Sequence, residues 1–137
     1  MSYWLLKTEP TDYSFDDLLR DKRVVWEGVS NPTALGHLRR VEKGDTVVVY
    51  HTGKEKSAIG LAEVTRGAYA DPKLGDPKRV VVDLKPVRRL KAAVPLADFR
   101  ADAVLKTTEL VRISRLSVVP LTAAHFARVL ERAGEKA

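Results

Sequence analysis

Small residues recur at alternate positions between 57 and 66, and this pattern constrains the fold more than any other feature of the sequence. Side chains alternate across a strand, so Ala58, Gly60, Ala62 and Val64 are predicted to share one face. Small residues inside a strand permit a sharp bend or the close approach of another backbone. The pattern therefore predicts a strongly curved sheet, such as that of a small barrel.

The other segments alternate between strand and helix signals. Predicted strands cover residues 3–8, 45–51, 57–66, 79–90 and 113–119. Predicted helical segments follow capping residues or helical spacing of apolar residues, and they begin near Ser14, Asn31, Pro95, Thr107 and Thr122. Gly44 is expected to end the second helix, and Pro86 to mark a sheet edge or a bulge. Since no repeat or linker divides the chain, we expect one α+β domain over residues 1–137 with a mainly antiparallel sheet.

The hexapeptide Trp26-Glu27-Gly28-Val29-Ser30-Asn31 is the clearest functional signal. It is predicted to be a loop in which Asn31 caps the helix that begins at the following proline. An indole ring, a flexible glycine and free backbone N–H groups at one place suit a flat polar ligand such as a nucleobase. A structural alternative explains the same residues, because Trp26 could belong to the core and Asn31 could act only as a cap.

The charge balance is compatible with a nucleic-acid partner. Lysine and arginine number 24 against 18 acidic residues, which gives a net charge of +6 and a pI near 9.7. Many ordinary soluble proteins are equally basic, so this balance identifies no partner by itself. Cysteine is absent, which excludes disulfides and thiolate metal sites and fits the cytoplasm, where we expect the protein to reside. The N-terminal residues lack the features of a signal peptide, and the apolar runs are too short to span a membrane, so no membrane partner is expected.

The segment Lys7-Thr8-Glu9 holds a potential base, hydroxyl and acid, and it is the main argument for an enzyme. On a strand, Lys7 and Glu9 would face one side and Thr8 the other, so the three would converge only at a bulge. An ion pair between Lys7 and Glu9 is the simpler expectation. The sequence shows no metal-ligand spacing, nucleophile elbow or phosphate-binding glycine loop, so we predict no catalytic residue, metal or cofactor.

Several short motifs occur in an order that a known family shares. They are Tyr3–Pro10, Tyr13-Ser14, Trp26–Val29 with Asn31, Gly44-Asp45, Tyr50-His51, Gly60–Val64, Tyr69–Pro72 and Ser114–Val118. In this order, and over nearly the whole chain, the sequence resembles an EVE domain and the thymocyte nuclear protein family that carries it. The resemblance implies a PUA-like pseudobarrel with peripheral helices, related to the YTH readers of methylated adenine in RNA. It also implies recognition of a modified base in nucleic acid, which in some members is modified cytosine in DNA.

The resemblance also implies a set of pocket residues. Trp26 corresponds to an aromatic wall on which a base would stack, and hydrogen bonds to the Watson–Crick edge of a flipped base would supply selectivity. The predicted nucleic-acid-binding residues are Lys7, Thr8, Trp26, Gly28, Val29, Ser30, Asn31 and His51. For His51, at a strand end, a structural hydrogen-bonding role is the alternative.

Basic residues near the hexapeptide are candidates for phosphate contacts. Arg20 and Arg23 precede the hexapeptide, and we predict that both contact phosphates. Arg39, Arg40 and Lys43 follow the next helix, where cations also complement the helix dipole without any ligand.

The sequence departs from the family pattern at three positions. Many relatives have Arg at the place of Ser30 and an Arg-Asn pair at the place of Leu35-Gly36. The predicted function is a non-catalytic module that recognises a modified or flipped base in DNA or RNA, with the modification left open by these departures. The alternatives are a PUA-like RNA-binding protein, a hydrolase of modified nucleosides, and a structural or protein-binding module with a degenerate pocket.

Overall fold

A six-stranded sheet in the order β2-β5-β4-β3-β1-β6 forms the centre of the computed structural model, which describes residues 1–135. The strands are β1 (Tyr3–Thr8), β2 (Val24–Trp26), β3 (Thr46–His51), β4 (Ser57–Ala70), β5 (Val80–Pro95) and β6 (Val118–Leu121). β1 and β3 pair in parallel, and the other neighbouring strands among residues 1–135 pair antiparallel. The predicted α+β class with a mainly antiparallel sheet is therefore confirmed.

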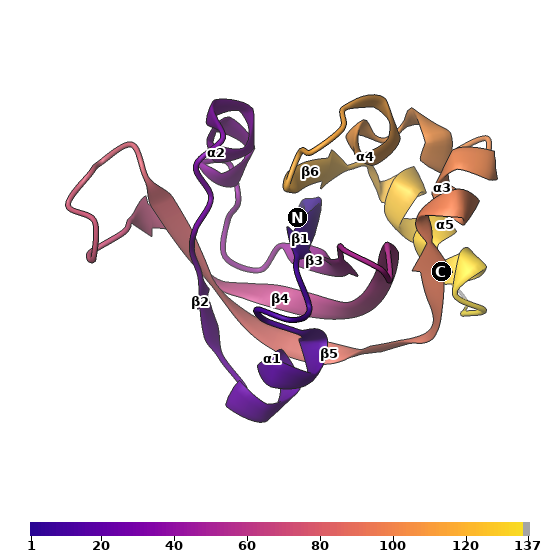
Figure 1. Ribbon diagram of the computed structural model, residues 1–137, viewed down its shortest axis with the longest axis horizontal. Helices are drawn as coiled ribbons and strands as arrows, with labels where there is room; N and C mark the ends of the chain where they lie inside the picture. Colours follow the sequence, from indigo (N-terminus) through magenta and orange to yellow (C-terminus); the bar gives the residue numbers. More distant parts are fainter. Residues whose placement is uncertain (136–137) are drawn as a thin grey trace.

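Helices lie around this sheet in two groups (Figure 1). The bounds are α1 (Phe15–Asp21), α2 (Pro32–Leu38), α3 (Leu96–Ala101), α4 (Glu109–Arg112) and α5 (Ala123–Arg132), with a 3₁₀ turn, η1, at Leu105–Thr107. Helices α3, α4 and α5 gather at one end of the molecule, whereas α2 and α1 lie above and below strand β2 in this view (Figure 1). No helix within the described residues is long and apolar enough to cross a membrane.

Bulges in the long strands bend the sheet. Val49 pairs with Gly60 and Tyr50 pairs with Ala58, so Ile59 is the extra residue of a β-bulge. The bulge turns Ala58 to the face that Tyr50 occupies, opposite to Gly60. The prediction of one shared face from 58 to 64 is therefore wrong for Ala58. Alternation in the sequence does not reveal where a strand carries an extra residue relative to its partner.

A second bulge lies on the partner strand β5. Leu61 pairs with Arg88 and Ala62 pairs with Pro86, which leaves Val87 as the extra residue. Pro86 was predicted to mark an edge or a bulge, and the bulge is confirmed. Proline fits here because a bulge interrupts the ladder of backbone hydrogen bonds that needs an N–H at each paired position.

Gly60, Ala62 and Val64 do share a face, and Gly60 makes room for an aromatic ring. A Cβ atom at Gly60 would lie 2.5 Å from Cζ of Phe15, a fully buried residue of α1. The predicted close approach is confirmed, although the neighbour is a side chain rather than a backbone. This contact seats α1 on the sheet and so positions the turn between β1 and α1.

We expect Gly60→Ala to lower the free energy of unfolding by about 2 kcal/mol, because the added methyl group overpacks the contact with Phe15. Urea unfolding followed by circular dichroism measures the change. Gly36→Ala is the matched control, since no heavy atom lies within 4 Å of its Cβ position in α2. That control is expected to be neutral or slightly stabilising, because alanine favours a helix more than glycine does. Equal stability of the two variants would contradict the packing described for Gly60.

Predicted helix starts agree with the structure better than predicted ends. Ser14 and Asp17 form a capping box at α1, Asn31 caps α2 and Thr122 caps α5. Helix α2 ends at Leu38, well before Gly44, which instead adopts a positive φ of 91° ahead of β3. The strand predicted at 113–119 begins only at Val118. These ends depend on packing against other elements, which local sequence does not specify.

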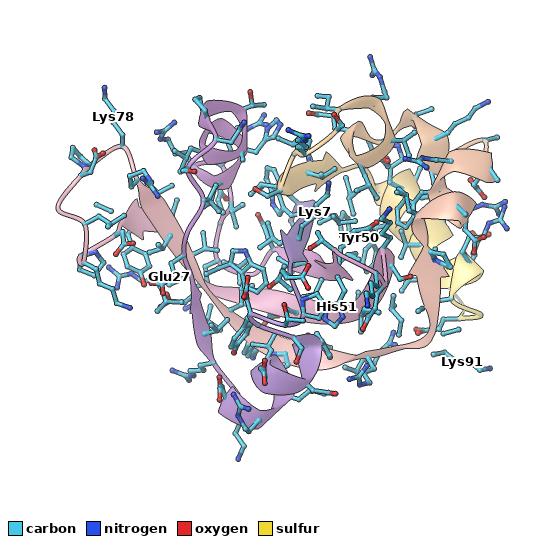
Figure 2. The ribbon with its side chains drawn as sticks, in the orientation of Figure 1. Lys7, Glu27, Tyr50, His51, Lys78 and Lys91 are labelled. Atoms are coloured by element: carbon cyan, nitrogen blue, oxygen red, sulfur yellow. The ribbon has the colours of Figure 1, made fainter. Side chains whose placement is uncertain are left out.

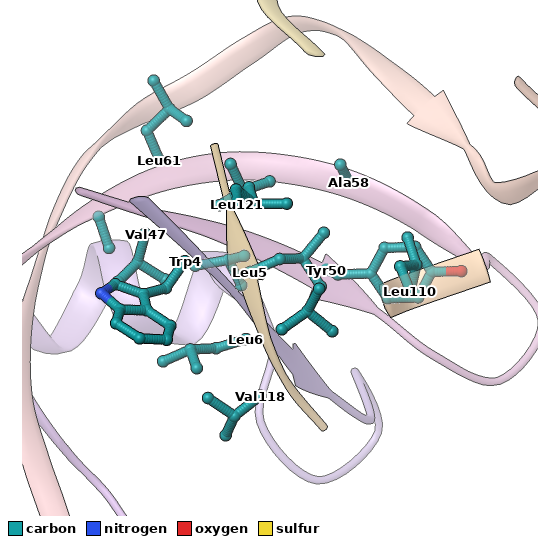
Figure 3. Packing of buried hydrophobic residues seen from close by; sticks show 14 of the residues in the cluster. Trp4, Leu5, Leu6, Val47, Tyr50, Ala58, Leu61, Leu110, Val118 and Leu121 are labelled. Carbon is teal, nitrogen blue, oxygen red and sulfur yellow. The ribbon is translucent and has the colours of Figure 1, made fainter. Parts of the chain in front are cut away.

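The hydrophobic core lies on both faces of β1 (Figure 3). One face carries Trp4 and Leu6, which are in register with Val47 of β3 and Val118 of β6. The other face carries Leu5, which belongs to the same buried cluster as Tyr50, Ala58, Leu110 and Leu121 (Figure 3). Side chains pack against both faces of β1. Of its last two residues, Lys7 lies on the face of Leu5, and Thr8 lies on the opposite face.

Candidate functional site

A pocket of about 330 Å³ opens between the end of β1, the turn that follows it, and strand β2. Its volume falls at the lower end of the range of small-molecule sites. The lining residues are Thr8, Asp12, Tyr13, Val24, Val25, Trp26 and Glu27. Strand β2 is one of the two edge strands of the sheet, so this pocket has one wall formed by a sheet edge.

Two aromatic rings form the apolar part of the pocket. Trp26 and Tyr13 meet edge to face, with ring centroids 6.4 Å apart and an interplanar angle of 87°. Trp26 is only 7% exposed and belongs to the hydrophobic core, and it also lines the pocket. The core alternative and the pocket-wall prediction therefore describe the same residue.

Strand β2 places Trp26 where it can both pack in the core and line the pocket. Trp26 pairs with Val82 of β5, and Val24 pairs with Leu84. Because paired residues point to the same face, Val24 and Trp26 join the interior while Val25 faces outwards and is 43% exposed. The sequence predicted a loop over residues 26–31, so the strand ending at Trp26 corrects that prediction.

The hydroxyl groups of the pocket already donate to the protein. Thr8 Oγ1 donates to the backbone oxygen of Tyr13 at 2.7 Å, and the Tyr13 hydroxyl donates to Asp21 Oδ2 at 2.9 Å. Burial, together with the bond to Asp21, raises the pKa of Tyr13 to about 12. Tyr13 is therefore a neutral phenol at physiological pH. With these protons engaged, the two oxygens keep only acceptor capacity for a ligand.

Two carboxylates complete the polar part of the pocket. Asp12 is exposed and, within the described part of the chain, its carboxylate has neither a hydrogen bond nor an ion pair. Glu27 pairs with Lys73 Nζ of the β4–β5 loop at 3.3 Å, and both side chains are largely exposed. Figure 2 shows Glu27 on the side of the molecule where that loop projects. The polar side chains of the pocket thus suit a ligand that donates hydrogen bonds.

Lys7 lies away from the pocket, on the opposite face of β1. Its Nζ atom is 5.9 Å from the ring centroid of Tyr50, and the two residues lie near one another in Figure 2. Partial burial lowers the pKa of Lys7 below its ordinary value. Glu9 instead accepts hydrogen bonds from Thr11 and Thr52, so the expected Lys7–Glu9 ion pair does not form.

His51 has a structural role in this fold. The backbone N–H of Phe15 donates to His51 Nε2 at 3.0 Å, which requires the ring proton to be on Nδ1. Nδ1 then donates to Glu55 Oε2 at 2.7 Å. His51 is 4% exposed and ties α1 to the end of β3, so both ring nitrogens are engaged within the protein.

Residues 28–31 lead from β2 to α2 and do not line the pocket. Gly28 has a positive φ of 85°, and the backbone oxygen of Val29 accepts from Arg79 Nε at 3.2 Å. Asn31 Oδ1 accepts from the backbone N–H of Ala34 at 3.0 Å, as the cap alternative expected, and Ser30 is exposed. Of the predicted binding residues, the structure brings only Thr8 and Trp26 together in the pocket.

Asp12, Tyr13 and Val24 line the pocket, and sequence reasoning did not single them out as binding residues. The family motif Tyr13-Ser14 was a signal for Tyr13, the aromatic residue that packs against Trp26. Nothing local identified Asp12 or Val24, because the pocket that they line forms only when β2 pairs with β5 and lies beside the turn after β1. Leu35, at one of the departures from the family pattern, is buried in the core and 5% exposed.

The two arginines predicted to contact phosphates differ in their surroundings. Arg20 is bound to Asp17 at 2.9 Å and to Asp21 at 3.0 Å. Arg23 is exposed and pairs with no carboxylate among residues 1–135. A phosphate at Arg20 would compete with two carboxylates, whereas one at Arg23 would not.

Comparison with known proteins adds family evidence to this geometry. The EVE domain matches residues 2–132. Thymocyte nuclear protein 1 from Homo sapiens is 30% identical over 163 aligned positions, which cover 94% of this chain and 72% of that protein. The NMR structure of Rpa0253 from Rhodopseudomonas palustris has 37% identity and a TM-score of 0.92, covering 98% of this chain and 94% of that one.

A second solved structure is that of human THYN1 protein in complex with 5-methylcytosine-containing DNA. It shares 29% identity and a TM-score of 0.90 with this chain, and the match covers 100% of both. The PUA-like fold and the resemblance predicted from the sequence are confirmed by these matches. The chain belongs to the EVE domain family.

Proposed function

We propose that this protein is a non-catalytic nucleic-acid-binding module that takes a modified or flipped base into the pocket of Trp26 and Tyr13. The observation that carries the proposal is an aromatic pocket with hydrogen-bond acceptors, in a fold shared with a human protein solved with 5-methylcytosine-containing DNA. A 5-methylcytosine in DNA is accordingly the first ligand to test. The same pocket chemistry admits a modified base of RNA.

The pocket chemistry matches what a methylated cytosine presents. Its ring would stack on an aromatic side chain, a contact worth about 1–3 kcal/mol for any base. Its exocyclic amine donates hydrogen bonds, and carboxylates are the side chains that accept from that amine. Asp12 is the unpaired carboxylate in the pocket, so it is the proposed partner of the amine.

Binding rather than catalysis is the activity that the side chains support. Lys7 faces Tyr50, Thr8 donates to the Tyr13 carbonyl, and Glu9 binds Thr11 and Thr52, so the base, hydroxyl and acid of the Lys7-Thr8-Glu9 segment do not converge. General acid–base and nucleophilic catalysis both need their groups within hydrogen-bond reach of one another. An oligonucleotide incubated with the protein should therefore keep its mass.

Fluorescence anisotropy at fixed salt tests the proposal with matched oligonucleotides. The set contains DNA and RNA, single-stranded and duplex, each with one central cytosine or 5-methylcytosine and with thymine or uracil in its place. DNA with 5-methylcytosine is expected to bind most tightly. Equal affinity for all central bases would contradict base recognition, and turnover seen by mass spectrometry would establish the hydrolase alternative.

Asp12→Ala is expected to weaken binding to the 5-methylcytosine oligonucleotide by about 1.5–3 kcal/mol, because one hydrogen bond to a charged group is lost. Removal of a negative charge would by itself strengthen binding to a negatively charged nucleic acid. Weaker binding would therefore show that Asp12 contacts the ligand directly. Glu131→Ala, an exposed acidic residue of α5, removes the same charge away from the pocket and is the control. Unchanged affinity of Asp12→Ala, with the same melting temperature as wild type, would remove Asp12 from the site.

A further inference from the structure

A basic groove crosses the face of the sheet opposite to the pocket. We name it the outer groove, and its charged lining residues are Arg23, Lys43, Arg66, Lys85, Glu63 and Asp83. Its volume is about 540 Å³, and a smaller hollow of about 250 Å³ beside it is lined by Val24 and Val25 of β2. The four cations are exposed.

Strand β2 alone separates the outer groove from the pocket. Val24 and Val25 line the pocket and also the hollow that continues into the outer groove. Val25 pairs with Asp83, which places the outward face of β2 beside the floor of the groove. Since β2 is an edge strand, a ligand with one end in the pocket reaches the groove by passing over that edge.

The two acidic residues of the outer groove are already engaged. Glu63 pairs with Lys85 at 3.1 Å. Asp83 accepts a hydrogen bond from the Tyr69 hydroxyl. Burial and the bond to Asp83 raise the pKa of Tyr69 to about 12, so Tyr69 stays a neutral donor. Glu63 is therefore neutralised by Lys85, whereas Asp83 keeps its charge and is hydrogen-bonded to a neutral phenol.

The cations outnumber the carboxylates, and three of the four have no carboxylate partner among residues 1–135. Arg66 lies over the ring of Tyr69, with its guanidinium carbon 3.6 Å from the ring centroid. Within residues 1–135, Arg23 and Lys43 form no ion pair, and both line the groove. Four cations against two carboxylates give the groove a net positive charge. Arg23 and Lys43 can thus bind an anion without breaking an existing ion pair.

We propose that the outer groove binds the phosphodiester backbone of the same nucleic-acid strand whose base occupies the pocket, with Arg23 and Lys43 as the main phosphate contacts. This inference rests on the proposed function, because the backbone placed in the outer groove is covalently joined to the base in the pocket. Lysine and arginine contacts to phosphate position a nucleic acid and carry no base information. The outer groove therefore supplies affinity and orientation, and the pocket supplies base preference.

The double variant Arg23→Ala/Lys43→Ala tests the inference. The slope of log Kobs, the observed association constant, against log salt concentration should become less negative by roughly 1.4–1.8. Each lost phosphate contact removes about 0.7–0.9 from the magnitude of that slope. The loss should be the same for cytosine and 5-methylcytosine oligonucleotides. The control is Lys91→Ala/Arg112→Ala, which removes the same charge from exposed positions on β5 and α4. Lys91 lies at the opposite end of the molecule from Glu27 (Figure 2).

Each outcome separates this inference from the proposed function. The outer groove and the proposed function are both supported if only Arg23→Ala/Lys43→Ala has a shallower slope and this variant keeps the preference for 5-methylcytosine. Equal slopes for the two double variants would overturn the outer groove while leaving base recognition intact. A shallower slope in a protein that shows no base preference supports the groove and overturns the proposed function. Absence of binding to every oligonucleotide, even at low salt, would overturn both.

Discussion

Trp26→Ala is expected to lower the free energy of unfolding by about 3–5 kcal/mol and also to abolish base recognition. The loss of stability follows from burial, because Trp26 is 7% exposed and packs edge to face on Tyr13. A typical domain is stable by only about 5–15 kcal/mol, so this variant should be close to unfolding at 37 °C. Urea unfolding by circular dichroism measures the effect without relying on tryptophan fluorescence.

A milder pair of variants separates the core role of Trp26 from its pocket role. Trp26→Phe and Trp4→Phe each replace a buried indole with a smaller ring, but only Trp26 lines the pocket. Trp4→Phe also loses the hydrogen bond from the indole to Asp45 Oδ2 at 2.9 Å, so it should destabilise the fold at least as much. We expect Trp26→Phe alone to weaken binding to the 5-methylcytosine oligonucleotide, measured on folded protein at low temperature. Equal binding by the two variants would show that Trp26 serves only the core.

Asp102→Ala is expected to lower the free energy of unfolding by about 3 kcal/mol, with no effect on base preference. Asp102 is 1% exposed and follows α3, and it accepts from Arg128 Nε at 2.7 Å and Arg132 Nε at 2.8 Å. It also accepts from the backbone N–H groups of Val104 and Leu105. Loss of one partner of a buried ion pair costs about 3–5 kcal/mol. The lower value applies because the two arginine side chains are 38% and 37% exposed and stay hydrated.

The stabilisation by Asp102 should depend on pH. Burial by itself would raise the pKa of Asp102, but hydrogen bonds from Leu105, Arg128 and Arg132 outweigh it and hold the pKa far below the ordinary value. A carboxyl with a depressed folded-state pKa stabilises the fold at pH values above its unfolded pKa of about 3.9. That contribution is lost as the pH falls from there through the folded-state pKa.

Urea unfolding of wild type and Asp102→Ala at several pH values measures this dependence. The difference in unfolding free energy should be constant from pH 5 to 7 and shrink below about pH 4. Asp76→Ala, in the exposed β4–β5 loop, is the control and should show a small difference at every pH. A difference for Asp102→Ala that persists unchanged to pH 2 would mean that packing, not charge, explains its effect.

The features that the sequence predicted correctly depend on neighbouring residues. Helices are capped by Ser14, Asn31 and Thr122, whose side-chain oxygens accept hydrogen bonds from backbone N–H groups three residues away. Strand β1 was predicted with its observed bounds because aromatic and aliphatic residues favour an extended chain wherever it pairs. The family motifs likewise identified the PUA-like fold, because a series of matched segments restricts the topology more than any single segment does.

The candidate site was predicted only in part. Trp26 and Thr8 were named and do line the pocket, whereas Lys7 faces away because side chains alternate along β1. Asn31 and His51 were named for the same pocket, but each already bonds to the backbone of a helix. Sequence shows that a side chain has hydrogen-bonding groups, and only the folded structure shows which of those groups are already engaged.

The sequence by itself determined the fold class, the family and the presence of an aromatic residue beside a helix start. Tertiary structure alone decided that Val24–Trp26 forms an edge strand on β5, and so created both the pocket and the outer groove. It also decided that Arg20 is bound to Asp17 and Asp21 while Arg23 is not. The physical reason is the range of the interactions: capping and alternation act within a few residues, whereas strand pairing joins residues far apart in the sequence. Such contacts form only when the whole chain has folded.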